Sequence, residues 1–525
     1  MIMERKWWTL LAVCSGTFML LLDTTILYVA LPALQTDLHA SFAQIQWVVD
    51  AYALALATLL LTAGTLADRF GRRRLYLVGL SVFTAGSLLC GCAGSAALLI
   101  AARTLQGLGG SVMFATGLAL IGSAFEGRQR GTAFGIWGMV TGFASALGPI
   151  AGGVLTSGVS WRATFLVNVP IGAVAVAIVL RKVAETPIGR TRRLDLPGFV
   201  LFTTGLGSAV YGLIRLGETG SGAAPGYAWL GAGVALTAAF LVVESRVADP
   251  MFQLGLFRIP TFVGGSVSAF AMNGSMFAMF LYIAVYFQDA LGYSALDAGV
   301  RLLIASLAML ASSLLSGRLT GRVPVRFLIG GGLLTVALGL FLMLGVDAST
   351  SWTHFVVGSV VTGLGAGLVN PALASTAIGV VEPARSGMAS GVNSTFRQIG
   401  TSSAVAVLGA VFASVVSSRL TSGLAAVPGL APRAQELAAR VRGGELPAAV
   451  ASVPERYRGE VARLARAGFD SAINDLLLIT GGVALVGGVF ALVLIRGRDF
   501  VAAAPPQRPV PSPSAEPVPE PSGVA

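Results

Sequence analysis

The chain has 525 residues, of which 55% are hydrophobic and only 11% charged, and its mean hydropathy is +0.80. A chain this apolar is not a soluble globular protein, so we expect a polytopic membrane protein with an all-α fold. Its net charge of +11 does not indicate a nucleic-acid partner, because the basic residues stand singly or in small groups between apolar runs, as orientation in a membrane requires.

Fourteen apolar runs follow one another along the chain, each long enough to cross a bilayer as a helix. They cover residues 8–34, 45–66, 75–94, 97–122, 132–157, 163–181, 197–217, 227–244, 261–287, 297–316, 325–346, 353–378, 388–416 and 475–495. The first run follows a charged N-terminus like that of a signal peptide. Because it continues past residue 30, we interpret it as a retained first span.

Arginine is concentrated in the connections that follow even-numbered spans. The densest of these holds four arginines and one aspartate between Gly64 and Arg74, whereas the short connections 35–44, 218–226, 288–296 and 347–352 contain no Lys or Arg. The positive-inside rule therefore predicts a cell-membrane protein with both termini in the cytoplasm. Only Lys6 and Lys182 are lysine, which suggests a GC-rich bacterial genome.

One outer connection, residues 417–474, breaks this pattern with eight arginines, but long translocated segments are exempt from the rule. Apolar residues from Tyr457 to Phe469 recur there at helical spacing and predict an amphipathic helix that can lie on the outer surface. The segment is either a solvated hairpin that caps the bundle or a part of substrate gating. Residues 498–525 are rich in proline and predict a disordered cytoplasmic tail.

The chain also repeats itself after about half its length. The pattern Gly64-x-Leu66-x-x-Arg69 recurs 253 residues later, beginning at Gly317, and Gly131-x-x-x-Gly135 recurs 256 residues later, beginning at Gly387. Two six-helix halves related by an axis along the membrane normal produce such a repeat. We place the halves at residues 1–182 and 261–497, with an inserted pair of spans in 183–260.

The loop from Gly64 to Arg74 resembles the cytoplasmic loop signature of the major facilitator superfamily. Fourteen spans with a central inserted pair are similar to the drug:proton antiporter branch of that family. The resemblance implies two six-helix bundles plus two inserted helices, and a salt-bridged latch that holds one conformation. The latch residues it implies are Gly64, Asp68, Arg69, Gly71 and Arg72. Plain topogenic charge is the alternative, but it explains the arginines and not the glycines or the acid.

The first span carries Asp23 in a sequence similar to the first-helix motif of the family, from which it departs at Tyr28, where an Asn is usual. A carboxylate at mid-span costs about 2.5 to 3.5 kcal/mol on insertion scales, so Asp23 is a candidate proton carrier that faces the interior. Tyr28 is a candidate substrate contact.

Arg103 lies in a stretch that matches the fourth-helix motif of the family, and it is the only basic residue inside the first-half spans. It is therefore the natural partner of an acid and couples proton binding to conformation, unless its side chain snorkels to the outer surface. Asp50, near the outer end of the second span, is either an acid that pairs with cationic substrates or a solvated helix start.

The fifth span resembles the signature that marks antiporters in this family. Small residues allow close approach of helices, and the proline bends the span. The residues that carry this signature are Gly142, Gly148, Pro149, Gly152 and Gly153.

In the second half, Asn393 and Arg397 lie on one face of a span, as expected for this branch, and Asn273 is a third polar candidate for substrate binding. The spans of this half contain no obvious mid-membrane acid. Such a lining suits a broad amphipathic ligand.

We therefore expect a proton-coupled antiporter that exports amphipathic, cationic or broad-range small molecules by alternating access. A dedicated exporter of a self-made metabolite or amino-acid-like solute is the nearer alternative, and a membrane enzyme or a sensor is a more distant one. No ATP-binding loop, metal cluster or catalytic set is present in the sequence, so we expect the proton gradient as energy source, no cofactor and no metal. The expected partners are a small-molecule substrate, protons and the lipid bilayer, and the expected state is a monomer.

Overall fold

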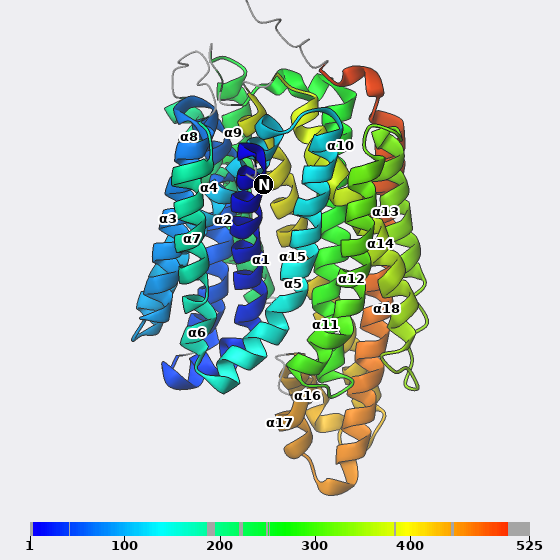
Figure 1. The fold of residues 1–525 in the computed structure, drawn as a ribbon. Coiled ribbons are helices and arrows are strands. Elements are labelled where there is room, and N and C mark those ends of the chain that lie inside the picture. Colours follow the sequence, from blue (N-terminus) through cyan, green and yellow to red (C-terminus); the bar gives the residue numbers. More distant parts are fainter. Residues whose placement is uncertain are drawn as a thin grey trace, which may run out of the picture.

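The structure is a computed structural model that describes residues 4–40, 42–185, 195–219, 224–247, 250, 252–382, 385–442 and 446–501. The described chain is a bundle of long helices, with short connections at both ends (Figure 1). The predicted disordered tail lies almost entirely outside the described residues.

The first half is a bundle whose helices follow the predicted spans closely. They are α1 Arg5–Asp37, α2 Phe42–Phe70, α3 Arg72–Gly91, α4 Ala96–Ala124, α5 Gly127–Gly158, α6 Trp161–Leu166 and α7 Asn168–Lys182. The predicted sixth span is divided into α6 and α7 at Val167, so Asn168 is the first residue of α7. This break places a polar side chain inside an otherwise apolar span.

The inserted pair consists of α8 Leu196–Thr219 and α9 Ala224–Glu244, which pack against each other. Helix α8 also contacts α2 of the first half and α15 of the second half, where Leu206 and Val210 form a small core with Ala57 and Ile399. Much of α9 is exposed in the isolated chain, as expected for a helix that faces lipid.

The second half begins with a broken helix and ends with two very long ones. Its helices are α10 Pro260–Met272, α11 Ala278–Asp289, α12 Ala295–Leu319, α13 Val325–Phe341, α14 His354–Gly379, α15 Ser386–Ala425, α16 Ala434–Arg442, α17 Leu446–Ala451 and α18 Glu455–Leu494. Between α10 and α11 the chain continues as a π-helical turn, Asn273–Phe277. Such turns inside a helix are frequent at functional sites.

Twelve helices in the described ranges are long and apolar enough to cross a membrane, and α5, which bends by 44°, would be a thirteenth. Helix α13 is apolar but has only 17 residues. The chain is thus an all-α, multi-pass membrane protein, and the count of fourteen spans stays a prediction.

The outer connection is a helical extension and not a loop. Helices α15 and α18 each have 40 residues and run far beyond the predicted spans 388–416 and 475–495. They join α16 and α17 below the second half (Figure 1). The predicted amphipathic helix is the start of α18, and its apolar residues, Val461 and Phe469 among them, are buried in the core of this extension. The apolar side of this helix thus packs against the other helices of the extension, and its position at the outer surface stays a prediction.

The two ends of the described chain lie at the same end of the bundle, as an even number of spans requires (Figure 1). At the opposite end of α1, Asp37 Oδ2 accepts hydrogen bonds from Trp161 Nε1 at 3.0 Å and Arg162 Nη1 at 2.8 Å. These two bonds hold the pKa of Asp37 below its ordinary value. They fasten the C-terminal end of α1 to the start of α6.

Candidate functional site

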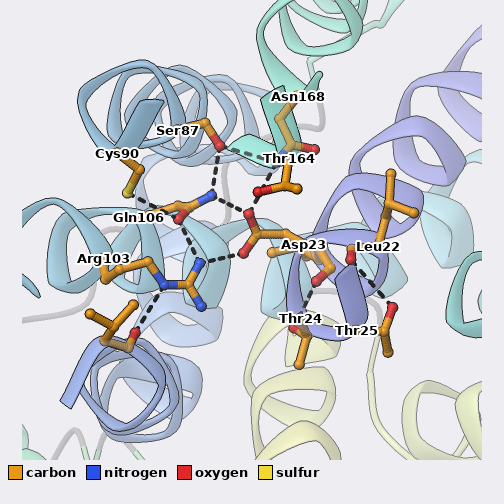
Figure 2. A network of polar contacts seen from close by, with 12 residues as sticks. Leu22, Asp23, Thr24, Thr25, Ser87, Cys90, Arg103, Gln106, Thr164 and Asn168 are labelled. Carbon is orange, nitrogen blue, oxygen red and sulfur yellow. Dashed lines mark hydrogen bonds and ion pairs between the residues drawn. The ribbon is translucent and has the colours of Figure 1, made fainter. Parts of the chain in front are cut away.

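A buried carboxylate lies inside the first half, on α1. Asp23 is fully buried, and its Oδ2 accepts a hydrogen bond from Arg103 Nη1 of α4 at 2.5 Å (Figure 2). Its Oδ1 accepts from Gln106 Nε2 of α4 at 2.8 Å and from Asn168 Nδ2 of α7 at 3.1 Å. Three donors from two helices thus stabilise the carboxylate anion.

Arg103 is as well satisfied as the acid that it pairs with. Its side chain is 1% exposed, so snorkelling to the surface does not occur. Besides Asp23, it donates from Nε to the Val48 carbonyl oxygen of α2 at 3.1 Å and from Nη1 to Gln106 Oε1 at 2.8 Å. Its guanidinium carbon also lies 4.1 Å from the centre of the Tyr52 ring, within the range of a cation–π contact.

The network extends to α3 through Ser87, whose hydroxyl accepts from Gln106 Nε2 at 2.6 Å and from Asn168 Nδ2 at 3.2 Å. Five helices, α1, α2, α3, α4 and α7, therefore meet at one charged pair (Figure 2). Asp23 and Arg103 therefore form the charged centre of a hydrogen-bond network that joins these five helices.

The glycines of the predicted antiporter motif bring α5 against the turn of α1 that follows Asp23. A Cβ at Gly148 would collide with the side chain of Thr25, and a Cβ at Gly152 would lie 2.8 Å from the Ile26 carbonyl oxygen. These positions admit no side chain without a shift of α1. The motif therefore fixes how closely α5 approaches the helix of the buried acid.

The rest of the motif lies near the second half. A Cβ at Gly142 would lie 3.5 Å from Met309 of α12, and one at Gly153 would lie 3.7 Å from Leu296. The axis of α5 bends by 44° between Ser145 and Ile150, the segment that contains Pro149, as the sequence predicted. The side chain of Pro149 is outside the described part of the chain.

Asp68, on the predicted latch loop, joins the two halves. Its Oδ1 accepts from Arg72 Nη2 at 2.8 Å and from the backbone N–H of Gly387 at 3.0 Å, and its Oδ2 accepts from the N–H of Met388 at 2.9 Å. Gly387 and Met388 are in the first turn of α15, whose N–H groups have no partner within the helix. The carboxylate of one half thus caps a helix of the other, where the helix dipole favours negative charge.

The other latch residues have different positions. Gly71 has a positive φ of 99° between α2 and α3, a conformation that glycine adopts without strain. Arg69 is half-buried with its guanidinium carbon 5.3 Å from the centre of the Phe70 ring, so the ion pair to Asp68 comes from Arg72 and not from Arg69.

Glycine pairs close the halves against each other at two places, which we call the seams. At the first seam a Cβ at Gly64 of α2 would collide with the Gly387 carbonyl oxygen of α15. At the second, a Cβ at Gly317 of α12 would lie 2.6 Å from the Gly131 carbonyl oxygen of α5. The two repeated motifs of the sequence therefore meet each other twice, each time across the halves.

Arg397 and Asn393 form a second buried polar cluster, in the second half. The side chain of Arg397 donates from Nε to Asn393 Oδ1 at 3.0 Å and from Nη1 to Asn370 Oδ1 of α14 at 2.6 Å. All three side chains are buried. A small pocket between α10, α14 and α15 reaches Asn393, and its other lining residues include Thr261, Ser266 and Thr376.

The three remaining predicted substrate contacts are on α2, at the π-helical turn and on α1. Asp50 is half-buried on α2, two residues after Val48, whose carbonyl oxygen accepts a hydrogen bond from Arg103. Asn273 opens the π-helical turn, and its Nδ2 donates to the Ala269 carbonyl oxygen at 3.0 Å. The side chain of Tyr28 lies outside the described residues.

Sequence reasoning missed a buried acid in the second half. Asp470 of α18 is 5% exposed and accepts hydrogen bonds from Tyr286 Oη at 2.7 Å and Arg466 Nε at 2.9 Å. It was overlooked because the hydropathy of the last span begins five residues later. Arg466 also donates to the carbonyl oxygens of Ala290 and Thr350, so this cluster fastens α18 to the connections that follow α11 and α13.

Sequence reasoning also left out the amides of the Asp23 network, Gln106 and Asn168. Their positions in the sequence could have identified them. Gln106 lies one turn after Arg103, and Asn168 is an isolated amide in an apolar run. A polar side chain at membrane depth needs a partner.

The comparisons with known proteins agree on one family. The family model described as "Major Facilitator Superfamily" matches residues 13–405. The "Tetracenomycin C resistance and export protein" of Streptomyces glaucescens is 35% identical over 97% of this chain and 95% of its own. The "Multidrug resistance protein Stp" of Mycobacterium tuberculosis is 37% identical over 78% of this chain and 77% of its own.

Among solved structures, the human organic anion transporter MFSD10 aligns with 93% of this chain and all of its own, with a TM-score of 0.62. Its sequence identity is 13%, so this likeness shows the fold alone.

Proposed function

Since the chain belongs to the major facilitator superfamily and is a membrane transporter rather than an enzyme, we propose that it is a proton-coupled antiporter. It exports amphipathic small molecules, drugs or antibiotics among them, from the cytoplasm by alternating access. The names of the two relatives, a resistance and export protein and a multidrug resistance protein, support an exported drug-like substrate.

The observation that carries the proton coupling is the buried pair of Asp23 and Arg103. An acid at membrane depth is a default candidate for proton transfer. Asp23 of α1 is hydrogen-bonded to α4 and α7, so its protonation can change how these helices pack during transport. When Asp23 takes up a proton it loses its ion pair, which frees α1 from α4. When it releases the proton, Arg103 draws the carboxylate back and restores the junction.

The conformational cycle uses the seams between the halves. Both seams are closed in this structure, and Asp68 stabilises the first by capping α15. Opening the seams would expose the central region to the side that carries the Asp68 loop. A protonation change at Asp23 reaches the seams through α5, whose glycines touch α1 at one point and α12 at another.

The proton gradient is sufficient for this work without a nucleotide. A driving force of about 100 mV supplies ~2.3 kcal/mol per proton, which supports a concentration gradient of roughly 50-fold in a one-for-one exchange.

A second candidate function is the dedicated export of a metabolite that the cell itself makes. The name of the Streptomyces relative, which joins resistance with export of a single compound, favours it. The two candidates differ in breadth of substrate and not in mechanism.

The test is transport in proteoliposomes with purified protein. With the intravesicular side acidic, we expect accumulation of several unrelated amphipathic compounds against their gradients, abolished by a protonophore. Transport of one compound alone supports the dedicated exporter. If none of the compounds is transported in a pH-dependent way, the proposal is contradicted.

A further inference from the structure

The second half contains a buried positive charge that the described protein does not compensate. Arg397 is 7% exposed, and its Nη2 is buried with no hydrogen-bond acceptor. Beside it, Asn370 Oδ1 accepts the 2.6 Å bond from Arg397 Nη1, while Asn370 Nδ2 is also buried without a partner. Two unsatisfied donors therefore lie in one cluster.

No carboxylate of the described chain forms an ion pair with Arg397, whose two partners are both neutral amides. Arg103 shows the contrast, since it is also buried but has Asp23 at 2.5 Å. A guanidinium does not lose its proton in a protein, so neutralisation is not open to Arg397. A buried charge without a counter-charge and a buried N–H without an acceptor are both unfavourable by several kcal/mol.

We propose that Arg397 and Asn370 form a subsite for the negatively charged oxygen group, such as a carboxylate, of the exported molecule. A carboxylate has two acceptor oxygens in a plane, which match the planar guanidinium and the adjacent amide. The inference rests on the proposed function as an exporter, to which it adds the charge of the substrate.

The position of the subsite links its occupancy to the seams. On α15, Ser390 donates from its hydroxyl to the Ala115 carbonyl oxygen of α4 at 2.7 Å, across the two halves. Asn393, which holds Arg397, is one helical turn further along, and Gly391 packs on Leu60 of α2. An anion that draws Arg397 toward itself therefore acts about two helical turns from the contact between the halves, with Asn393 between them.

The test uses equilibrium binding to purified protein in nanodiscs, which requires no proton gradient. Three fluorescent probes share one aromatic body and differ in charge: pyrenebutyrate, pyrenebutanol and pyrenebutyl-trimethylammonium. We expect the wild type to bind pyrenebutyrate more tightly than the other two. Equal binding of pyrenebutyrate and pyrenebutanol, or preference for the ammonium probe, would show that the subsite does not take anions.

Two variants change the charge in opposite ways. Arg397→Met should weaken pyrenebutyrate binding by about tenfold or more and leave pyrenebutanol within about twofold. Asn370→Asp supplies a carboxylate at the position of the present 2.6 Å contact, so it should occupy the guanidinium, raise the melting temperature and remove the preference for pyrenebutyrate. Gln398→Met, next to Arg397 but half-buried and outside the cluster, is the matched control and should bind like the wild type.

The outcomes separate a subsite from a merely structural arginine. If Arg397→Met weakens all three probes equally, or if Asn370→Asp binds pyrenebutyrate like the wild type, Arg397 only joins α14 to α15 and the inference is wrong. A failure of proton-driven transport in the vesicle assay contradicts the proposed function but leaves this binding result standing.

Discussion

Two buried charges, Asp23 and Arg397, have opposite environments. Asp23 has an ion pair and two amide donors, so the protein itself compensates its charge. Arg397 has two amide acceptors and no acid among the described residues, so its charge is stable only when a ligand supplies the acid. The two proposals follow from this difference, because Asp23 is the proposed proton carrier and Arg397 the proposed anion subsite.

The role of Asp23 is tested by removing its charge while keeping its shape. Asp23→Asn should reduce uphill accumulation from as much as roughly 50-fold to no gradient, because no group then carries the proton. Binding of substrate to purified protein should persist. Substrate-induced proton release is the direct measurement, and release that is undiminished in Asp23→Asn would assign the proton to another acid.

A second variant separates coupling from folding. Asp23→Asn leaves Arg103 buried without its counter-charge, which lowers stability. The double variant Asp23→Asn with Arg103→Gln removes both charges, so we expect it to regain thermal stability and to remain uncoupled. Regained uphill transport would contradict the role of the pair.

Asp50 is tested separately because it is the half-buried acid of α2 that the sequence analysis assigned to cationic substrates. Asp50→Asn should weaken cationic substrates by up to about fivefold, the range of a partly exposed ion pair, and leave neutral ones unchanged. Binding of a cationic and a neutral probe of equal size is the measurement. An equal loss for both probes would show that Asp50 acts on structure and not on substrate charge.

At the scale of elements, the contact between α2 and α15 depends on Asp68. Asp68→Asn removes a charge that accepts from Arg72 and from two N–H groups of α15. One charge-assisted hydrogen bond is worth about 1.5 to 3 kcal/mol, so the ratio of closed to open conformers should fall by about 10- to 150-fold. Transport should be lost while expression and membrane insertion remain nearly normal. Normal transport would mean that the loop serves only topology.

The closeness of α2 and α15 is tested by adding bulk at the seam. Gly64→Val places methyl groups where the Gly387 carbonyl oxygen lies, so the first seam should not close and transport should stop. Gly482→Val on α18 is the matched control, because a Cβ there meets nothing within 4 Å. If both variants transport like the wild type, the seam does not govern the cycle.

Features that follow from hydropathy or charge were predictable from the sequence. Contacts that depend on which face of a helix turns toward its neighbour were not. Asp23 and Arg103 were expected to meet because they are the mid-span acid and the only base of the first-half spans. The amides Gln106 and Asn168 were not assigned, since nothing in a sequence shows which face of α4 and α7 turns toward α1. The partners of Asp68 in α15 are backbone N–H groups, which no motif can display.

The outer extension shows the limit of hydropathy most clearly. Polarity rises after residue 416, so the predicted span ends there, but helix α15 continues to Ala425. Its hydrogen bonds do not require an apolar environment, and Leu420 and Leu424 find a core in α16 and α18. Hydropathy locates the membrane and not the end of the helix.

At the scale of the whole molecule, the two ends of the chain and the helical extension should lie on opposite sides of the membrane. Single cysteines at Ser418 and at Ser512, in a background without Cys14, Cys90 and Cys92, report this. An impermeant thiol reagent on intact cells should label Ser418→Cys and leave Ser512→Cys unlabelled. Labelling at Ser512→Cys would overturn the even count of spans.

The two seams have the geometry of an isologous dimer interface. In a two-fold homodimer, surface i of one subunit meets surface j of the other, and j meets i. Here Gly64 of the first copy of the repeat meets Gly387 of the second, and Gly317 of the second meets Gly131 of the first. The single chain thus has the contact pattern of a pair of identical subunits. Because both copies are in one chain, one copy of the motif carries Asp68 while the other carries Gly321 in its place, a difference that no symmetric pair of subunits can maintain.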